Sequence, residues 1–541
     1  MNISICRTFI LAIAMLYLLP VAQAQSLDQI GVTLLRATTT NLNGSGIRVA
    51  QPEASFGGSP PTFEVNPAAT GQPASLFTYI STVGTASTYP NSVGSESGHA
   101  DSVGGLFYGL AGGVATNAAH VDNYDADYFY NNVIAAIIPA NINASVANQS
   151  FIFCNTDGSH FDVSTEQGLD SQYDDYAAQY KTLFVSGAGN GGPTNQATVY
   201  PPATCYNGLG VAAYGGASCI GPTLDNGRCK PDITAPASAT SYSTPQVSGA
   251  AAVLMQAGLR GDGGSDTNSA ADLRTVKALL LNGAVKPANW TNSTSSPLDA
   301  RYGAGVLNVF NSYRQLAGGK SGYIVSNSVS LNAAHLPTGA AGTVGALSGW
   351  NFSTNISGKS VSSPSQFDTI HHYYFNVSNS LSAAGFNATA TLVWNRQMNQ
   401  SGINNLDLFL YNCANSNLVA CSTSLVDNVE HIYVTNLTQG RYDLQVWKAG
   451  GNLSLISAAE PYALAWQFVQ PPPLALARSG TNLNLTWPFY PAGFVAEANT
   501  NLLSAGGWST NQLPIVIFTN GQNALLLNPT NAAQFFRLRQ P

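Results

Sequence analysis

The alternation of short apolar runs with helical stretches between residues 25 and 318 constrains the fold more than any other sequence feature. Strand-like runs at residues 47–50 and 182–185 alternate with helix-like stretches at 100–110, 245–259 and 272–282. Pro245 suits the first turn of one helix, and Gly283 suits the C-cap of another. Such alternation is typical of βαβ units. We therefore expect an α/β domain with a doubly wound, mostly parallel sheet over residues 25–318.

The sequence changes character after about residue 318, where helical periodicity stops. Turns rich in Asn, Gly and Ser separate runs of strand composition at residues 372–377, 388–394, 406–411, 431–434 and 442–447. This pattern predicts an all-β sandwich over residues 319–470. Three prolines at 471–473 predict a stiff linker, and the strand-like runs that follow predict a small β-module over residues 471–541.

Few residues in the chain are charged, and this limits its partners. Only 9% of the 541 residues are Asp, Glu, Lys or Arg, and the net charge is −7. An average soluble protein has about 25% charged residues. The 20 Lys and Arg residues provide no basic stripe for a phosphate backbone, so we expect no nucleic-acid partner.

Residues 1–24 have the three parts of a signal peptide. Arg7 provides the positive charge, residues 9–21 form an apolar run, and residues 22–24 form an Ala-Gln-Ala cleavage site. The apolar run is too short for a membrane span. We therefore expect a secreted or periplasmic protein without a membrane anchor, whose mature chain begins near Gln25.

Loss of the signal peptide would leave six of the seven cysteines. An even number in a secreted chain predicts disulfides, although spacing cannot fix which cysteines pair. Short loops favour the pairs Cys413–Cys421 and Cys219–Cys229, which leaves Cys154 with Cys205. Buried free thiols are the alternative.

Three segments of the first domain each place a reactive side chain at the end of an expected element. Residues 44–53 form a turn and a strand that ends in Glu53, and residues 98–105 begin a small-residue helix at His99. Residues 240–252 place Ser241 at the amino end of a helix, where backbone N–H groups favour negative charge. An acid, a His and a Ser are the parts of a site for nucleophilic acyl transfer.

These segments resemble the motifs of subtilisin-type serine peptidases. Residues 185–192 are similar to the family's A-A-G-N loop, and residues 230–236 are similar to its K-P-D-x-x-A-P stretch. The order of acid, His, Asn and Ser also agrees, and the resemblance covers residues 25–318. The matches to the family's His motif are His99, Val103 and Gly105, and those to its Ser motif are Thr240, Ser241, Pro245, Val247 and Gly249.

The resemblance implies a role for each matched residue. Ser241 would attack the scissile carbonyl, His99 would act as base and then acid, and Glu53 would orient the imidazole. Asn190 and the backbone N–H of Ser241 would bind the oxyanion. The residues expected beside the substrate are Ser150, Phe151, Gly187, Ala188 and Gly189.

The chain departs from the family pattern at several positions. Glu53 stands where the family mostly has Asp, and Pro52 beside it is unusual inside a sheet. Glu64, Glu96 and Asp101 are the other candidate acids. Ala239 and Tyr242 replace the family's Gly and Met on either side of Thr-Ser.

These departures leave two alternatives to a secreted serine endopeptidase. One is a catalytically weakened, subtilisin-like binding or adhesion protein. The other is an esterase with the same triad, which the absence of a G-x-S-x-G elbow disfavours.

The chemistry implied by the resemblance requires no cofactor, and its partners would be protein or peptide substrates. The resemblance allows a structural calcium ion. Asp122, Asp125 and Asp127 form an acidic cluster, but it lacks the Gly and the closing Glu of an EF-hand loop. We predict a solvated loop there, assign no metal ligand, and expect a monomer.

Overall fold

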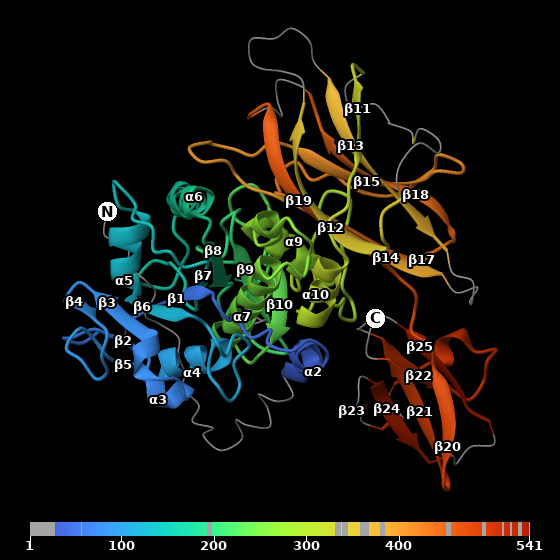
Figure 1. Cartoon of the computed structure of the whole chain (residues 1–541), viewed down its shortest axis with the longest axis horizontal. Coiled ribbons are helices and arrows are strands. Elements are labelled where there is room, and N and C mark those ends of the chain that lie inside the picture. The colour runs from blue at the N-terminus through green and yellow to red at the C-terminus, as the bar shows by residue number, and fades with distance from the viewer. Residues whose placement is uncertain are drawn as a thin grey trace.

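The computed structural model describes residues 27–539, except 56, 192–196, 331–336, 338–343, 358–366, 379–384, 451–455, 489–493, 511–512, 515, 520–521 and 529–532. The predicted signal peptide therefore lies outside the described residues. An α/β domain is followed by a pair of antiparallel sheets and by a small β-module at the end of the chain (Figure 1). The predicted fold class is confirmed.

Eight strands of the described chain form the sheet of the α/β domain, in the order β10-β9-β8-β7-β1-β6-β3-β4. All neighbours pair in parallel except β3 and β4. The strands are β1 (Arg48–Glu53), β3 (Phe77–Ser81), β4 (Gly84–Ala86), β6 (His120–Asp125), β7 (Val146–Gln149), β8 (Leu183–Gly187), β9 (Leu209–Tyr214) and β10 (Ile233–Pro236).

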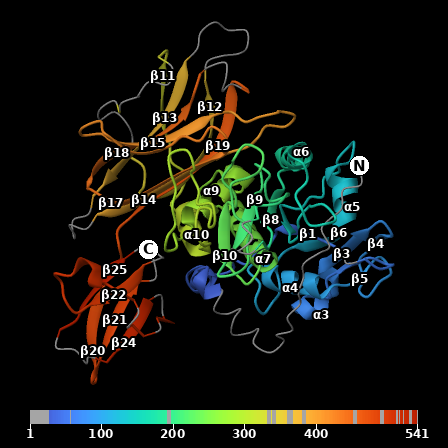
Figure 2. The same ribbon diagram turned by 180° about the vertical axis from the view of Figure 1, so that it is seen from behind.

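Helices cover both faces of this sheet (Figures 1 and 2). α4 (Gly98–Phe107) and α7 (Thr240–Leu259) lie on one face, and α5 (Ala126–Phe129) and α6 (Val163–Tyr180) lie on the other. Successive side chains of a strand point to opposite faces. Val49 accordingly packs in the same cluster as residues of α7, whereas Ala50 packs with residues of α5 and α6.

The strand order reverses at β1. The chain continues from β1 to β3 and β6 on one side of it, and β7 to β10 lie on the other side. Ligands of open α/β sheets bind at the carboxyl ends of the strands beside such a switch point. Glu53 is the last residue of β1 and therefore lies at this position.

Smaller elements complete the α/β domain. The remaining helices and strands are α2 (Val32–Thr38), α3 (Pro67–Thr70), η1 (Ala74–Leu76), η2 (Tyr130–Ile134), α8 (Thr267–Ala270), α9 (Leu273–Gly283), α10 (Val309–Ala317), β2 (Thr62–Glu64) and β5 (Ser95–Glu96). Two predicted details are wrong. Pro245 lies inside α7 rather than in its first turn, because that helix begins at Thr240. Gly283 is the last residue of α9 rather than its C-cap, which is Ala284.

Two antiparallel sheets follow α10. One has the order β11-β13-β18-β15-β16 and the other β12-β19-β14-β17. Their shared core contains large side chains such as Tyr373, Trp394 and Trp466. The strands are β11 (Ile324–Ser328), β12 (Ser348–Ile356), β13 (Asp368–Val377), β14 (Phe386–Trp394), β15 (Leu406–Asn412), β16 (Leu418–Ser422), β17 (Val429–Leu437), β18 (Gly440–Lys448) and β19 (Ala459–Val469).

The four-stranded sheet packs on the α/β domain through α9 and α10 (Figure 1). Trp350, Val393 and Ala463 of this sheet belong to the same buried cluster as the apolar residues of α9. The two regions therefore share one hydrophobic core, and burial of this core stabilises their relative position.

The C-terminal module has its own small core around Leu485, Trp487 and Leu525. Its four-stranded sheet has the order β20-β21-β24-β23, and β22 pairs with β25. Figures 1 and 2 show it as a separate body, in red. Its elements are β20 (Ala475–Ser479), β21 (Asn482–Pro488), β22 (Val495–Asn499), η3 (Ala505–Gly507), β23 (Ile517–Thr519), β24 (Gln522–Leu527) and β25 (Phe535–Arg539).

The predicted disulfide pairings are wrong. Cys154 is disulfide-bonded, whereas the described free thiols are Cys205, Cys219, Cys229, Cys413 and Cys421. Strand register explains one failure. Cys421 lies opposite Phe409 of the neighbouring strand. Cys413 follows Phe409 by four residues, which at the usual rise of a strand places it about 13 Å further along the chain. The Cα atoms of a disulfide lie only about 5.5–6 Å apart.

Candidate active site

The carboxylate of Glu53 is buried at the end of β1. The two-residue alternation of a strand places Val49, Gln51 and Glu53 on one face. Strand β1 pairs with β7 only at Val49 and Ala50, whereas its pairing with β6 continues to Glu53. Pro52 therefore lies where β1 has one neighbour, which is the position in a sheet that tolerates a missing N–H.

His99 is the second residue of α4, and Ser97 caps this helix by accepting a hydrogen bond from the Ala100 N–H at 3.3 Å. The Nδ1 atom of His99 forms a short hydrogen bond with Oε1 of Glu53. The structure thus brings Glu53, and not the other candidate acids, to the imidazole.

The other candidate acids have different partners. Glu64 accepts a hydrogen bond from Asn91 at 3.2 Å, and Glu96 accepts one from the Tyr89 hydroxyl at 2.7 Å. Asp101 accepts a hydrogen bond from the backbone N–H of Asn66 at 2.7 Å. None of these three contacts involves the imidazole of His99.

The pKa of His99 is raised by its surroundings. Burial acts in the opposite direction, since it disfavours the charged imidazolium and lowers the pKa. The negative charge of Glu53 and its hydrogen bond raise the pKa by more. A raised pKa makes the imidazole a stronger base, as proton transfer from a hydroxyl requires.

Ser241 is the second residue of α7 and is partly exposed. Pro245 has no N–H for the carbonyl one turn before it, which belongs to Ser241. That carbonyl instead accepts a hydrogen bond from the hydroxyl of Ser150 at 3.0 Å. The proline inside the helix therefore helps to tie the first turn of α7 to the segment after β7.

The hydroxyl of Ser241 is only weakly held. It donates a long hydrogen bond of 3.5 Å to the carbonyl of Ser150. Among the described residues, no hydrogen bond joins Ser241 to His99. Catalytic hydrogen bonds are often long or misaligned before substrate binds. A change of the Ser241 side-chain rotamer can redirect the hydroxyl.

Asn190 follows β8 and lies beside the start of α7. Its Oδ1 atom accepts hydrogen bonds from the N–H and the hydroxyl of Thr240, both at 2.8 Å. These contacts fix the orientation of the amide, so that its NH₂ group faces away from α7. Asn190 is exposed, and this NH₂ group is available as a donor.

The residues expected beside the substrate are placed differently from one another. Ser150 contacts Ser241, and Gly187 lies against Thr240 at the start of α7. The side chain of Phe151 is buried against Phe153, with ring centroids 5.6 Å apart.

Ala188 and Gly189 lie between β8 and Asn190. Ala188 donates its N–H to the carbonyl of Val211 at 2.9 Å, so it continues the sheet. Gly189 has a φ of +100°, and a Cβ there would lie 2.9 Å from the sulfur of Cys219. A larger residue would therefore displace the turn that carries Asn190.

The prediction of a solvated acidic loop at residues 121–127 is wrong. Asp122 and Asp125 are buried in β6. Asp122 pairs with Arg48 at 2.7 Å, and Asp125 caps α5 by accepting a hydrogen bond from the Tyr128 N–H at 3.0 Å. Within the described ranges, no group of three or more His, Cys, Asp or Glu residues could hold a metal ion.

Two residues of the site were not predicted from the sequence. Gln51 is buried beside Glu53, and the hydroxyl of the buried Tyr108 donates one hydrogen bond to the Gln51 side chain. Gln51 lies on the same face of β1 as Val49, and a polar residue at such a core position was the signal that could have revealed it.

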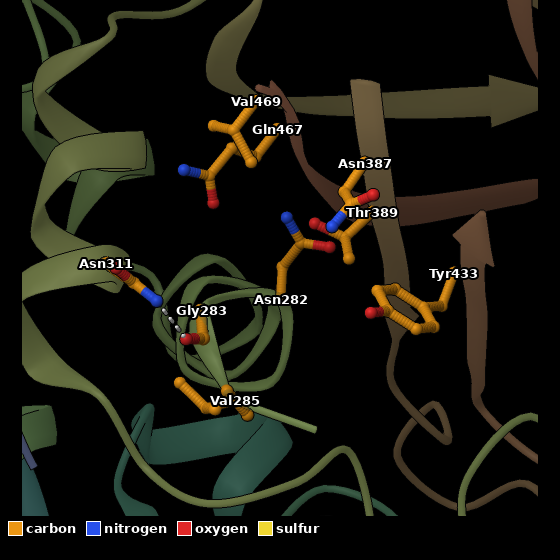
Figure 3. A pocket seen from close by; sticks show the side chains of 10 residues that line it. Asn282, Gly283, Val285, Asn311, Asn387, Thr389, Tyr433, Gln467 and Val469 are labelled. Carbon is orange, nitrogen blue, oxygen red and sulfur yellow. Dashed lines mark hydrogen bonds between the residues drawn. The ribbon is translucent and has the colours of Figure 1, made fainter. Parts of the chain in front are cut away.

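A separate, small pocket lies at the junction of α9, α10 and the four-stranded sheet. Figure 3 shows its polar lining, in which Asn311 donates a hydrogen bond to the carbonyl of Gly283 at 3.1 Å. The lining is Asn282, Gly283, Ala284, Val285, Asn311, Asn387, Thr389, Tyr433, Gln467 and Val469. None of the residues around Ser241 contributes to it.

A comparison with protein-family models supports a serine-type peptidase. Residues 77–305 match the family model described as the subtilase family. The chain therefore contains a subtilase-family domain. In the part of the chain that the structure describes, no helix combines the length and the apolar character needed to cross a membrane.

Several solved protease structures are similar to the chain. A serine protease of Aeromonas sobria is 13% identical, with a TM-score of 0.37, and the match covers 81% of this chain and 91% of that one. The prenylagaramide maturation protease PagA is 19% identical, with a TM-score of 0.33 and coverage of 54% and 99%. A protease from Pseudoalteromonas arctica PAMC 21717 is 20% identical, with a TM-score of 0.35 and coverage of 54% and 97%. No curated protein matches the chain in sequence.

Proposed function

We propose that the protein is a secreted serine endopeptidase that hydrolyses peptide bonds with Ser241, His99 and Glu53. The observation that carries this proposal is the hydrogen bond between His99 and buried Glu53, beside the helix start that bears Ser241. The oriented amide of Asn190 supports it further.

In this proposal, His99 removes the proton of the Ser241 hydroxyl as the oxygen attacks the peptide carbonyl. Glu53 holds the imidazole through Nδ1 and stabilises its charged form. The NH₂ group of Asn190 and the N–H of Ser241 donate to the oxyanion. His99 then protonates the leaving amine, and water hydrolyses the acyl-enzyme. No cofactor takes part in these steps.

The segment at residues 1–24 supports secretion or export to the periplasm, since it has the charge, apolar run and cleavage site of a signal peptide. We propose that the substrates are proteins or peptides and that the enzyme is a monomer. The resemblance to subtilisin-type peptidases allows a structural calcium ion, and the proposal includes one.

A second candidate is a subtilisin-like binding protein with a weakened triad. The observation that favours it is the contact of the Ser241 hydroxyl, which faces the carbonyl of Ser150 rather than the imidazole.

Labelling with a fluorophosphonate decides between the two candidates. We expect stoichiometric labelling and digestion of casein by the mature wild-type protein, and loss of both in Ser241→Ala, by at least about 10⁴-fold in turnover. The matched control is Ser102→Ala, because Ser102 is exposed on α4 and its hydroxyl bonds only to the carbonyl of Gly98.

Two results would reject the endopeptidase proposal. One is folded wild-type protein that takes up no label, which favours the binding protein. The other is hydrolysis of short-chain esters without cleavage of casein or peptides, which favours an esterase.

A further inference from the structure

Gln51 is a fully buried polar residue two positions before Glu53. Its Nε2 atom donates a hydrogen bond to the carbonyl of Ala100 at 3.0 Å and faces Oε2 of Glu53 at 3.5 Å. Its Oε1 atom accepts a hydrogen bond from the hydroxyl of Tyr108 at 2.6 Å. One amide thus contacts β1 and both ends of α4.

Tyr108 anchors the oxygen of this amide. The Tyr108 side chain is fully buried, and burial raises the pKa of its hydroxyl well above the ordinary value. The hydroxyl therefore keeps its proton and donates it to Oε1 of Gln51. The carbonyl of Ala100 and the carboxylate of Glu53 only accept, so the NH₂ group of Gln51 faces them and its Oε1 faces the hydroxyl.

The contact with Ala100 matters because Ala100 directly follows His99 in the first turn of α4. The same amide therefore bonds at 3.0 Å to the turn that carries the imidazole and makes a long contact of 3.5 Å with the carboxylate. In the described part of the chain, Gln51 and His99 are the two side chains with hydrogen bonds to Glu53. Glu has one more rotatable bond than Asp, so its carboxylate needs more restraint to keep one orientation.

We propose that Gln51 is a positioning residue that holds Glu53 against His99, and that Tyr108 anchors the oxygen of the Gln51 amide. This inference rests on the proposed function, since it assigns Gln51 to the proposed triad. Gln51 acts through Glu53 and touches no reacting atom.

The experiment separates positioning from a purely structural role through the titration of His99. His99 faces Glu53 of β1 and the ring of Tyr242 in α7, whose centroid lies 6.1 Å away. Asp101 on the same helix is bonded to Asn66. If the carboxylate swings away, its charge raises the pKa of His99 less, while burial still lowers it.

The test compares Gln51→Leu and Tyr108→Phe with a matched control, Gln315→Leu. Gln315 is also fully buried, and its amide accepts from Asn282 and donates to Gln467, far from the triad. For Gln51→Leu we expect kcat to fall about tenfold with KM unchanged, because a misplaced group costs turnover more than binding. For Tyr108→Phe we expect kcat to fall about threefold, because the Gln51 amide remains but loses the hydrogen bond to its oxygen.

The titration of His99 is followed by NMR in a Ser241→Ala background, so that it needs no activity. We expect its midpoint to move to lower pH in Gln51→Leu, and less far in Tyr108→Phe, but to stay in place in Gln315→Leu. A midpoint that stays in place in folded Gln51→Leu would overturn the proposal. If Gln51→Leu does not fold, an unchanged midpoint in Tyr108→Phe overturns it equally.

The two hypotheses can fail separately. If the wild-type protein neither takes up the fluorophosphonate nor cleaves casein, the proposed function fails. The NMR titration still shows whether Gln51 holds Glu53 against His99. If the wild-type protein is active and the titration does not move, only the role of Gln51 is rejected.

Discussion

Two regions of the molecule bury charged side chains and use them in opposite ways. At the carboxyl end of β1, the buried carboxylate of Glu53 meets a partly exposed His99 and a weakly held Ser241. At the junction with the four-stranded sheet, Arg396 is buried and forms ion pairs with Asp174 at 3.3 Å and Asp175 at 3.0 Å.

Most polar groups of Arg396 at the junction are hydrogen-bonded, although its Nε atom and Oδ2 of Asp174 have no hydrogen-bond partner among the described residues. The guanidinium of Arg396 donates to the carbonyls of Gln400 at 2.6 Å and Ser171 at 3.0 Å. Its backbone exchanges two hydrogen bonds with Asn207, of 2.8 Å and 2.9 Å. These contacts occupy both terminal nitrogens of the guanidinium and both backbone polar groups of Arg396.

The site around Ser241 keeps unused bonding capacity. The Asn190 amide has its oxygen bonded and its NH₂ group exposed, and the Ser241 hydroxyl has one long hydrogen bond. The difference teaches that burial of charge alone does not mark a functional site. The informative feature is a buried charge that orients groups with free donors or acceptors.

The largest expected effect that tests this comparison is that of Glu53→Gln, which keeps the size of the side chain and removes its charge. We expect kcat to fall about 10⁴-fold, because the imidazole loses its orientation and the stabilisation of its charged form. The free energy of unfolding should change far less. A fall in kcat of less than about tenfold would reject Glu53 as the acid of the triad.

The same variant changes the dependence on pH. His99 must be neutral to act as base, so wild-type activity rises with pH through a pKa above the ordinary histidine value. Without Glu53, burial remains and lowers the pKa, so the rise should move to lower pH. A raised folded-state pKa also stabilises the fold below the unfolded pKa of about 6.5. This contribution to the free energy of unfolding should disappear as the pH rises through the pKa of His99 in the folded protein.

The next effect concerns the junction and is expected in stability rather than turnover. Arg396→Met removes the cation and leaves the carboxylate of Asp174 buried without it. We expect the free energy of unfolding to fall by about 3–5 kcal/mol, measured in a denaturant titration, with kcat per folded molecule unchanged.

The matched control for the junction is Arg260→Met. Arg260 is exposed and pairs with Asp262 at 2.5 Å, so its loss should cost below about 1 kcal/mol. An equal effect of the two substitutions would mean that the ion pairs at the junction do not fix the sheet against the α/β domain.

The smallest of these effects is expected at Asn190. Removal of one oxyanion donor costs about 10²–10³-fold in turnover. Asn190→Ala also removes the acceptor for Thr240, so Asn190→Asp is the sharper variant, because it keeps an acceptor and loses the NH₂ group. Both should lower kcat and leave KM unchanged.

A substitution of an exposed asparagine outside the site is the control for Asn190. Asn131→Ala removes a side chain that donates only to the carbonyl of Asp127, and we expect no change in kcat. Full activity of Asn190→Asp would show that this amide does not donate to the oxyanion.

The sequence by itself determined the class of fold and the order of its parts. The strand and helix periods are local properties, so the run that ends in Glu53 and the run that begins at Thr182 were recognisable without any partner. The motifs around His99, Asn190 and Ser241 are also contiguous. Their residue types and order could therefore be found along the chain.

Only the tertiary structure decided which of these residues meet. The choice of Glu53 over Asp101 depends on β1 lying in the sheet beside α4, and the role of Gln51 depends on the same packing. Asp122 looked solvated because its partner, Arg48, lies on another strand. The disulfide prediction failed for the same reason: loop length measures distance along the chain, whereas strand register sets the distance in space.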